Sequence, residues 1–472
     1  MTWKVKILTE GSKMIGLGHI YRCLALKEVL EARKINCEMI IAETEPIENF
    51  AKISNISYID WKRNDELSSL IGGKPHCIIV DSYLASEKHY SKLANGKHQL
   101  YIIDDNNDFR YSRGTIVNPS FLANELIYPR GNRQFRFLLG STYTLIRPVF
   151  SKSVNRTYCG NIKNILVMIG GTDVLGVSRK IVDNCMNYFP NSEIHLVYKD
   201  DESIWPENIH RYHNLDEHQI RQLMIKADFA IVGAGQTIFE LIATQTPFLA
   251  IKVAENQSLN LKLLERDQLA FTVANIHHLP DVFLEAKKIN NRLNIVNNQK
   301  KYKLNGANNV IDDLLLQSVQ MDKMELKDSK DIYDLSSSAG VRKWSKSKKF
   351  FSFDSHEVWL RKQHEDKHTF FLVIRRKVDQ KFLGQIRFSQ TLDKQFLVSL
   401  SFTLDLRGKK LGSYLLDLAI EYLKKETSVN IIYAEVLNDN ISSIKVFEKS
   451  GFVKWEENQN LFIFRKLLVK ED

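Results

Sequence analysis

Residues 4–30, KVKILTEGSKMIGLGHIYRCLALKEVL, place an apolar strand, a glycine turn and a helix in direct succession. Apolar residues dominate the start of this stretch and recur at helical spacing after the glycines. Gly16 and Gly18 let the backbone approach a ligand closely, and the first turn of the following helix offers unpaired N–H groups to an anion. The pattern predicts either a phosphate site beside His19 or a plain strand-to-helix connection.

Further apolar runs in the first 155 residues also end in polar side chains. Residues 77–80 (CIIV) precede Asp81, and residues 101–103 (YII) precede Asp104. Short β-branched runs between helix-like segments indicate an α/β domain with a parallel, doubly wound sheet, whose ligands bind outside the carboxyl ends of the strands. We therefore expect these residues at the same sheet edge as His19: Asp81, Ser82, Tyr83, Asp104 and Asp105.

The acidic run at residues 104–108 (DDNND) invites comparison with a calcium loop. An EF-hand loop needs glycine where Phe109 stands and a glutamate at its end, and this sequence has neither. We therefore expect these side chains to cap and hydrogen-bond a loop rather than to bind a metal.

A second strand-and-glycine pattern starts at residues 164–169 (NILVMI) and continues through residues 229–232 and 248–251. Glycine-bearing or polar segments follow each run. A glycine loop before a helix suits a diphosphate, and Glu240 in that helix is placed to accept hydrogen bonds from ribose hydroxyls. The alternative is that Glu240 lies on the surface of its helix.

The composition is that of a globular protein of about three domains, with 472 residues, of which 44% are hydrophobic. No stretch reaches the roughly 20 apolar residues of a membrane helix, and the start of the chain lacks a signal-peptide pattern. The five cysteines all lie within the first 185 residues and include no C-x-x-C pair. We expect a cytoplasmic protein with reduced, mostly buried thiols, whose net charge of +10 suits anionic ligands.

The motifs of the first 315 residues resemble, in order and spacing, the UDP-2,4-diacetamido-2,4,6-trideoxy-β-L-altropyranose hydrolase family of pseudaminic acid biosynthesis. The segments that carry the resemblance are GLGHIYRCLAL (16–26), VDSY (80–83), IDDNNDFR (103–110), LLGSTYTLIRPVF (138–150), IGGTD (169–173), GAGQTIFELIATQTPFLAI (233–251) and AENQ (254–257). The resemblance implies two Rossmann-like domains, 1–155 and 156–320, in the arrangement of the GT-B glycosyltransferases.

By this resemblance, His19 is the general base for a water that attacks the anomeric carbon, and Tyr83 and Asn256 position the sugar and the water. The implied UDP-sugar site comprises Gly18, Arg22, Gly170, Gly171, Thr172, Gly235, Thr237, Glu240 and Gln257. The resemblance implies no metal. Ser82 stands where the family often has histidine, so any role of that histidine is absent here or carried by another residue.

A different pattern follows residues 320–329, a polar stretch that we expect to be a linker. Residues 370–374 and 384–388 predict a hairpin, and residues 396–402 a further strand. The segment 406–412 (LRGKKLG) then precedes a helix. Consecutive N–H groups at a helix start, with basic side chains beside them, suit a diphosphate.

That loop, together with VRKWS (341–345), HEVWL (356–360) and NDNISSIKVFEKSGF (438–452), resembles the GNAT family of acetyl-CoA-dependent N-acetyltransferases, which implies a third α/β domain at 321–472. Acetyl-CoA is then the cosubstrate. Its implied contacts are Leu406, Arg407, Gly408, Lys409, Lys410, Leu411, Gly412, Asn440 and Phe447. Lys410 takes a glycine position of the family's loop, and Phe447 replaces the tyrosine that protonates the departing thiolate. Glu435 is our candidate for deprotonating the acceptor amine.

The two resemblances together predict a bifunctional enzyme. It would N-acetylate a UDP-4-amino sugar and then hydrolyse the UDP-2,4-diacetamido sugar with inversion and without a metal. The expected partners are the UDP-sugar and acetyl-CoA. We expect no binding to nucleic acid or to a membrane. One alternative is a GT-B glycosyltransferase whose acetyltransferase has another acceptor. A basic nucleic-acid-binding protein is disfavoured because no nucleic-acid motif is present and the basic residues spread over all three domains.

Overall fold

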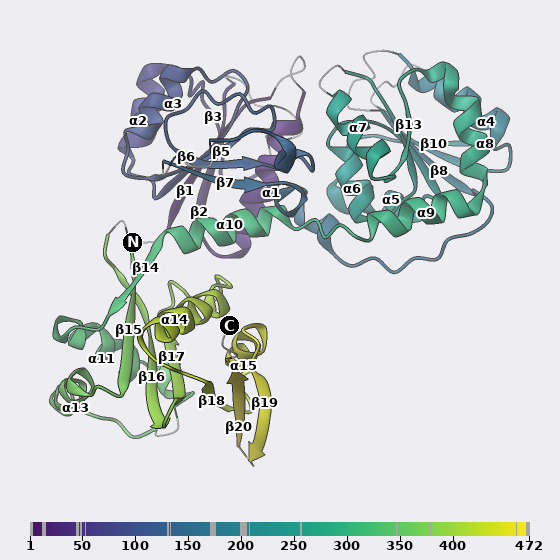
Figure 1. Cartoon of the computed structure of the whole chain (residues 1–472). Helices are drawn as coiled ribbons and strands as arrows, with labels where there is room; N and C mark the ends of the chain where they lie inside the picture. The colour runs from purple at the N-terminus through teal and green to yellow at the C-terminus, as the bar shows by residue number, and fades with distance from the viewer. Residues whose placement is uncertain are drawn as a thin grey trace. The chain divides into compact units, whose positions relative to one another are not determined.

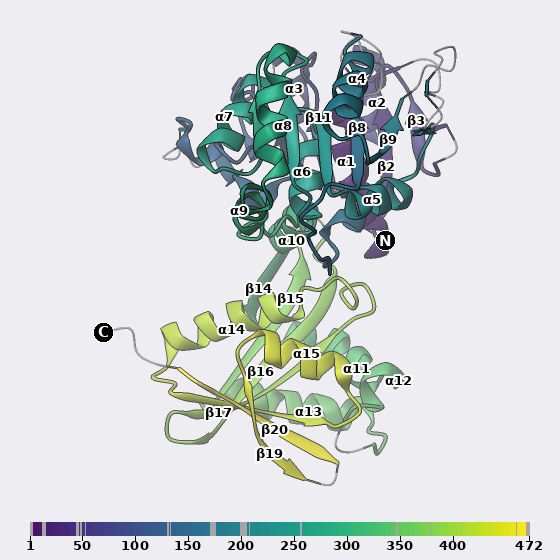
Figure 2. The ribbon, with the colours of Figure 1, turned by 90° about the vertical axis from the view of Figure 1, so that its right-hand side faces the viewer.

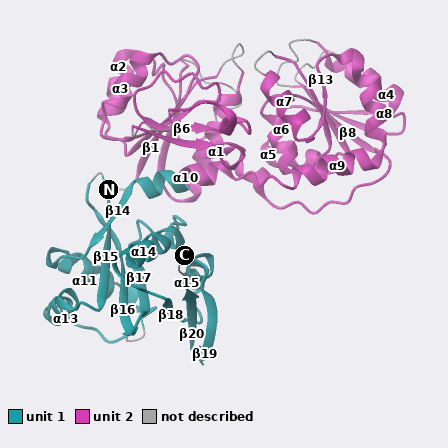
Figure 3. Ribbon diagram, viewed as in Figure 1, with its two compact units in different colours: residues 1–2, 312–472 teal, residues 3–311 magenta. Residues whose placement is uncertain are grey.

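The computed structural model describes residues 3–11, 16–43, 47, 50–51, 53–129, 132, 134–169, 176–198, 205–206, 208–254, 257–345, 348–377, 379–458 and 460–468. The chain forms two compact units, of residues 3–311 and 312–472 (Figure 3). The division falls within helix α10 (Gly306–Gln317). The finer boundaries expected after residues 155 and 320 stay predictions.

The larger unit begins with a seven-stranded sheet in the order β3-β2-β1-β4-β5-β6-β7 (Figure 1). The strands are β1 (Lys4–Thr9), β2 (Asn36–Ile41), β3 (Ile56–Tyr58), β4 (Cys77–Asp81), β5 (Gln99–Ile103), β6 (Gly114–Asn118) and β7 (Phe135–Leu139). All neighbours pair in parallel, which confirms the predicted doubly wound sheet. The helices are α1 (Gly18–Ala32), α2 (Asn64–Gly72) and α3 (Glu87–Ala94), with short 3-10 turns at Ala123–Glu125, Ser141–Tyr143 and Pro148–Ser151.

A second parallel sheet follows in the same unit, in the order β10-β9-β8-β11-β12-β13. Its strands are β8 (Asn164–Met168), β9 (Glu193–Val197), β10 (Ile209–Tyr212), β11 (Phe229–Gly233), β12 (Phe248–Ile251) and β13 (Phe271–Val273). Its helices are α4 (Ser178–Tyr188), α5 (Glu217–Lys226), α6 (Thr237–Ala243), α7 (Ser258–Arg266), α8 (Leu279–Lys287) and α9 (Ile289–Gln299), with a 3-10 turn at Ile276–His278. Relative to β8 the order is again that of a Rossmann sheet.

The smaller unit contains one mixed sheet in the order β14-β15-β16-β17-β18-β20-β19. The strands are β14 (Val319–Lys323), β15 (Thr369–Arg376), β16 (Phe382–Leu392), β17 (Gln395–Phe402), β18 (Ile431–Leu437), β19 (Val453–Asn458) and β20 (Leu461–Leu467). Only β17 and β18 pair in parallel among the neighbours. Helices α11 (Ser329–Ser337), α12 (Ala339–Arg342) and α13 (Phe353–Glu365) lie on one side of it, and α14 (Gly412–Glu426) and α15 (Ile441–Lys449) on the other (Figures 1 and 2).

The expected linker at residues 320–329 is wrong. Residues 319–323 form β14, whose hydrogen-bonded ladder with β15 runs from Val319 to Lys323, and a 3-10 turn (Leu326–Asp328) leads directly into α11. β14 is an edge strand, and edge strands are commonly polar because one side of the ladder faces no further strand. The predicted hairpin, by contrast, is confirmed by β15 and β16.

Burial within the larger unit follows the strand positions. The central strands β4, β11 and β12 are buried along their whole length, as parallel strands covered by helices on both faces should be.

All five cysteines are free thiols and only Cys159 is exposed. Within the described residues, no helix combines the length and apolar character that a membrane crossing requires.

Candidate functional sites

The first candidate site lies where β1 and β4 end side by side, at the reversal of strand order in the first sheet. His19 is the second residue of α1 and is 4% exposed. Its Nδ1 lies 2.6 Å from Oδ1 of Asp81, the buried last residue of β4. Asp81 and His19 therefore lie at the same edge of the sheet, as predicted from the strand ends.

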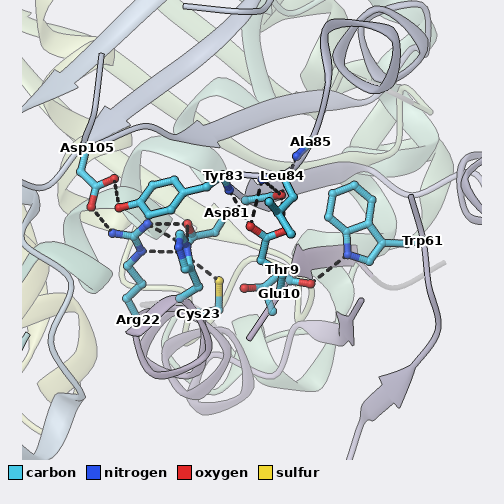
Figure 4. A network of polar contacts seen from close by, with 12 residues as sticks. Thr9, Glu10, Arg22, Cys23, Trp61, Asp81, Tyr83, Leu84, Ala85 and Asp105 are labelled. Atoms are coloured by element: carbon cyan, nitrogen blue, oxygen red, sulfur yellow. Dashed lines mark hydrogen bonds and ion pairs between the residues drawn. The ribbon is translucent and has the colours of Figure 1, made fainter. Parts of the chain in front are cut away.

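Arg22, one helical turn after His19, joins the same carboxylate. Its Nε lies 2.5 Å from Asp81 Oδ2 and its Nη2 lies 2.6 Å from Oδ1. Nη1 reaches 2.5 Å from Oδ2 of Asp105, so the guanidinium bridges two acidic side chains (Figure 4). The bidentate pair of Arg22 with Asp81 fixes the orientation of the carboxylate as well as its charge.

Asp81 and Arg22 each favour the charged form of the other. Burial alone would raise the pKa of Asp81, but Arg22 and His19 outweigh burial and hold that pKa well below its ordinary value. Burial likewise opposes the charge on Arg22, but Asp105 and Asp81 raise its pKa well above the ordinary value. Asp81 is therefore ionised at neutral pH.

An ionised Asp81 determines which nitrogen of His19 carries the proton. A carboxylate only accepts hydrogen bonds, so the 2.6 Å contact requires the hydrogen on Nδ1. Arg22 Nη2 also lies 3.0 Å from Nδ1, but it bonds Asp81 at shorter distance. In the neutral ring the lone pair is then on Nε2, so His19 can accept a proton there while Asp81 stabilises the charge that results.

The loop after β4 presents Tyr83 to the histidine. The two rings meet edge to face with centroids 4.2 Å apart, and the Tyr83 hydroxyl donates to Asp105 Oδ1 at 2.9 Å. Burial and then Asp105 raise the pKa of Tyr83, so the hydroxyl stays protonated. Ser82, which replaces the family's histidine, donates to Glu10 Oε2 at 2.5 Å. Glu10 also accepts from the Tyr83 backbone at 2.7 Å, so this serine supports the loop.

The acidic run after β5 divides between two tasks. Asp104 accepts hydrogen bonds from the Asp108 backbone and from the Tyr111 hydroxyl, which confirms the expected loop cap. Asp105 instead faces Arg22 and Tyr83. Over the described ranges, no group of three or more His, Cys, Asp or Glu is arranged to hold a metal ion.

The predicted UDP-sugar residues fall into several places. Gly170, Gly171, Thr172 and Asn256 lie outside the described residues. Gly18 begins α1 and is exposed, with open space where a side chain would stand, whereas Gly16 holds the left-handed conformation with φ of 79°. The glycine turn therefore shapes the start of α1 and leaves room in front of it.

Beyond β11, the structure brings Gly235 and Gln257 together. A Cβ on Gly235 would lie 3.6 Å from Nε2 of Gln257, whose Oε1 accepts from the Val253 backbone at 3.0 Å. Thr237 is the first residue of α6. These three predicted residues thus cluster at the reversal point of the second sheet, between β8 and β11.

Glu240 does not lie on the surface, so that alternative is wrong. It is 6% exposed and accepts from Nε and Nη2 of Arg147 at 3.0 and 2.9 Å. Burial raises its pKa, although Arg147 opposes the shift. Both bonds go to Oε1. Ile146, Val149 and Phe150, which flank Arg147, pack in the core of the second sheet, so this ion pair lies beside that core.

In the smaller unit the predicted diphosphate loop leads directly into α14. Leu406 and Leu411 are buried and anchor the loop, and the first N–H groups of the 15-residue helix have no intrahelical partner. Lys409 is buried, whereas Arg407 is exposed and donates from Nε to the Phe402 carbonyl at 2.8 Å. A Cβ on Gly412 would lie 2.8 Å from Val446 Cγ2, so glycine permits the close approach of α14 and α15.

Lys410 adopts a conformation that favours glycine. Its φ is 61°, in the left-handed region, and Gly408 nearby has φ of 76°. Lys410 thus holds a conformation that favours glycine, at a steric cost of about 1–2 kcal/mol.

Glu435 lies where two parallel strands part. The ladder between β17 and β18 ends at the pair Val398 and Ala434, although both strands continue. Glu435 is the next residue, half-buried, on the same face of β18 as Tyr433. Beyond the ladder, the facing backbone groups of the two strands are not used in pairing with each other.

The last two predicted acetyl-CoA contacts lie on α15. Asn440 is the N-cap, and its side chain accepts from the Ser443 backbone at 3.2 Å. Phe447 is 4% exposed and packs against Phe452 and Phe464, with centroids 5.2 and 6.2 Å apart. Both residues therefore have structural contacts, and their roles toward acetyl-CoA stay predictions.

A model of the acetyltransferase (GNAT) family matches residues 338–452. The smaller unit contains a GNAT domain. The match covers the loop before α14, the β17–β18 pair and α15, and it confirms the resemblance found in the sequence. GNAT membership supports the use of acetyl-CoA.

Three relatives extend the comparison. An uncharacterised protein of Methanocaldococcus jannaschii is 24% identical over 497 aligned positions, 97% of this chain and 98% of that protein. The pseudaminic acid cytidylyltransferase and UDP-2,4-diacetamido-2,4,6-trideoxy-beta-L-altropyranose hydrolase of Helicobacter pylori is 26% identical over 269 residues, 55% of this chain and 46% of that protein. The acetyltransferase PseH of Campylobacter jejuni is 27% identical over 115 residues, 24% of this chain and 70% of that protein.

These similarities confirm the resemblance to the hydrolase family and support an enzyme of pseudaminic acid or related nucleotide-sugar biosynthesis with an acetyltransferase. The chain spans less than half of the Helicobacter pylori relative, whose name covers two activities.

Two contacts of the first candidate site were not predicted from the sequence. The strand-end rule located Asp81 at the right edge but gave no reason to pair it with His19, 62 residues away. Glu10, directly after β1, was overlooked although it lies at the same edge and supports the Tyr83 loop. Glu10 could have been found by its position, because it is a carboxylate that directly follows the strand before the glycine turn.

The Lys410 conformation yields a stability prediction. Lys410→Gly should raise the free energy of unfolding of the GNAT domain by about 0.5–1 kcal/mol, because relief of the left-handed strain exceeds the added entropy of the unfolded chain. Lys410→Ala removes the same charge and keeps the Cβ, so it is the matched control and should bring no gain. Urea denaturation of the three proteins measures the difference, and equal stability of the glycine and alanine variants would contradict the strain.

Proposed function

We propose that the chain is a bifunctional enzyme that acts on one nucleotide sugar in two successive reactions. The GNAT domain would transfer an acetyl group to UDP-4-amino-4,6-dideoxy-N-acetyl-β-L-altrosamine. The larger unit would then hydrolyse UDP-2,4-diacetamido-2,4,6-trideoxy-β-L-altropyranose to the free sugar and UDP. The similarity to a hydrolase and to an acetyltransferase of one pathway supports this pairing.

The observation that carries the hydrolase half is the bond between Asp81 and His19. In the proposed step, His19 Nε2 takes a proton from water while the water oxygen bonds to the anomeric carbon. The bond between that carbon and the UDP oxygen breaks, and UDP leaves from the opposite face, so the configuration inverts. The imidazolium that forms keeps its Nδ1–H bond to the ionised Asp81, which offsets the new positive charge.

The remaining residues of the larger unit would hold the substrate. Tyr83, fixed by Asp105, and Asn256 would position sugar and water. The two glycine segments of the second sheet, residues 170–172 and 235–237, would bind the diphosphate through backbone N–H groups. Glu240 would bind ribose through Oε2, because Arg147 occupies Oε1. This scheme requires the GT-B arrangement of two domains, 1–155 and 156–320, which we propose with it.

The acetyltransferase half uses different chemistry. Acetyl-CoA supplies a reactive thioester. Glu435, at the point where the β17–β18 ladder ends, would take a proton from the acceptor amine. The backbone groups beyond that ladder would hydrogen-bond the amides of the pantetheine arm, and the N–H groups at the start of α14 would bind the diphosphate. Phe447 has no proton to give, so Tyr433, another tyrosine or water would protonate the thiolate, or the thiolate would leave unprotonated.

The hydrolase proposal is tested with the full chain and UDP-2,4-diacetamido-2,4,6-trideoxy-β-L-altropyranose, without acetyl-CoA or added metal. We expect UDP and the inverted sugar in NMR spectra. His19→Gln should lower kcat by about 100- to 10,000-fold, the usual contribution of a general base. His278→Gln, which changes an exposed histidine of the same unit, should retain full activity. Full UDP release by the His19 variant would contradict the assigned base.

The acetyltransferase proposal is tested with the UDP-4-amino sugar and acetyl-CoA by following thiol release. Glu435→Gln should lower kcat by about 100-fold or more with little change in the KM for acetyl-CoA. Glu448→Gln, an exposed glutamate of α15, serves as control. Phe447→Tyr tests whether a tyrosine at this position supplies the general acid that protonates the thiolate. An unchanged kcat in both the Glu435 and Phe447 variants would show that the catalytic site of this domain lies elsewhere.

A further inference from the structure

Arg147 packs against aromatic rings from two parts of the larger unit. Its side chain is 9% exposed. The guanidinium carbon lies over the ring of Phe150, 4.8 Å from the ring centroid, and over the ring of Tyr21, 5.2 Å from the centroid. Tyr21 belongs to α1 and comes two residues after His19. Contacts of a guanidinium with aromatic rings are attractive, so both rings hold the Arg147 side chain in place.

The hydrogen bonds of Arg147 leave one oxygen of Glu240 unused. Nε and Nη2 of Arg147 both donate to Oε1, at 3.0 and 2.9 Å. No described residue donates to Oε2, and that oxygen is not one of the fully buried polar atoms that lack a partner. The Glu240 side chain keeps 8% of its surface exposed. A carboxylate with one oxygen fixed and the other open can accept hydrogen bonds from the hydroxyls of a ligand.

The partners of Arg147 come from helices that start at the ligand-binding edges of both parallel sheets. Glu240 lies in the first turn of α6, which begins at the strand-order reversal of the second sheet. Tyr21 lies in α1, which begins at the reversal of the first sheet and bears His19. Ligands of doubly wound sheets bind at these reversal points. Arg147 therefore connects the two regions in which the sheets would bind ligands.

Further carboxylates lie within electrostatic reach of Arg147. Burial and then Glu217, the first residue of α5, raise the pKa of Glu28 in α1 to about 7, whereas Arg147 lowers it. Burial raises the pKa of Glu240, Arg147 opposes that rise, and Glu217 adds to it. Replacing Arg147 by a neutral residue would leave these carboxylates without its positive charge. Lysine, which keeps the charge, is therefore the informative replacement.

We propose that Arg147 is a positioning residue for nucleotide recognition: it holds Oε1 of Glu240 so that Oε2 accepts from the ribose hydroxyls, and Tyr21 holds its guanidinium from α1. The proposal rests on the assignment of Glu240 to the ribose in the proposed function. It adds that the helix that bears His19 also contributes to the selection of a ribonucleotide.

The test compares two nucleotides in calorimetric titrations of the full chain. The probes are UDP and 2′,3′-dideoxy-UDP, which keeps the base and the diphosphate and lacks both ribose hydroxyls. Wild type should bind UDP about 10-fold or more tightly than the analogue, because the hydroxyls would donate to a charged oxygen. Arg147→Lys has no planar fork with which to fix Oε1. It should bind UDP about 10-fold more weakly than wild type, and the analogue as tightly as wild type.

Two further variants accompany Arg147→Lys. Arg266→Lys changes an arginine that also forms a two-bond pair, with Asp267 at 2.6 and 2.8 Å, but at the exposed end of α7. It should bind both nucleotides as wild type does. Tyr21→Leu keeps the pair of Arg147 and Glu240 and removes the ring, so the preference for UDP should fall by about 2- to 5-fold. If Arg147→Lys melts at a lower temperature than wild type, Tyr21→Leu provides the deciding titrations.

The two nucleotides separate positioning from general damage. Equal losses of affinity for UDP and the analogue in Arg147→Lys would show a merely structural role and overturn the proposal. An unchanged preference for UDP in Arg147→Lys and Tyr21→Leu would also overturn it.

The same titrations distinguish this proposal from the proposed hydrolase. Equal binding of the two nucleotides by wild type would remove Glu240 from the ribose and overturn the role of Arg147 with it. A wild-type chain that binds neither nucleotide would contradict the nucleotide site itself. A preference for UDP that depends on Arg147, in a chain that does not hydrolyse the UDP-sugar, would support the role of Arg147 and refute the proposed hydrolase.

Discussion

The larger unit depends on one buried carboxylate that has two partners. Asp81 accepts from His19 and, through two bonds, from Arg22. A buried charge without partners would be prohibitively costly, so the ion pair must form for the end of β4 and the start of α1 to pack as they do. The same bonds fix the histidine tautomer. Structural and chemical requirements thus coincide at a single side chain, and we propose that the main task of the glycine turn is to position His19.

The two units use backbone geometry in different ways beside their candidate sites. In the larger unit, Gly16 and the close pair of Gly235 and Gln257 shape strand ends at the reversal points of two parallel sheets. In the GNAT domain, Lys410 and Gly408 both hold left-handed conformations in the loop before α14.

Much of this arrangement could be predicted from the sequence because it follows local rules. Short β-branched runs located β4 and β12 almost to the residue, and the strand-end rule gathered Asp81 and Asp105 beside His19. The sequence does not reveal interactions whose partner is distant along the chain. Glu240 is buried because Arg147, 93 residues earlier, neutralises it, and no local pattern announces that pair. The polar segment that became β14 resembles a linker because an edge strand needs few apolar side chains.

The central claim is that Asp81 holds His19 with its proton on Nδ1 and its lone pair on Nε2. Nitrogen-15 NMR of the histidine-labelled full chain at about pH 8 reads this tautomer directly, with the His19 signals assigned by their loss in His19→Gln. The account predicts a protonated Nδ1 and an unprotonated Nε2. A neutral His19 ring with the hydrogen on Nε2 would contradict it, because that nitrogen would then have no lone pair with which to activate water.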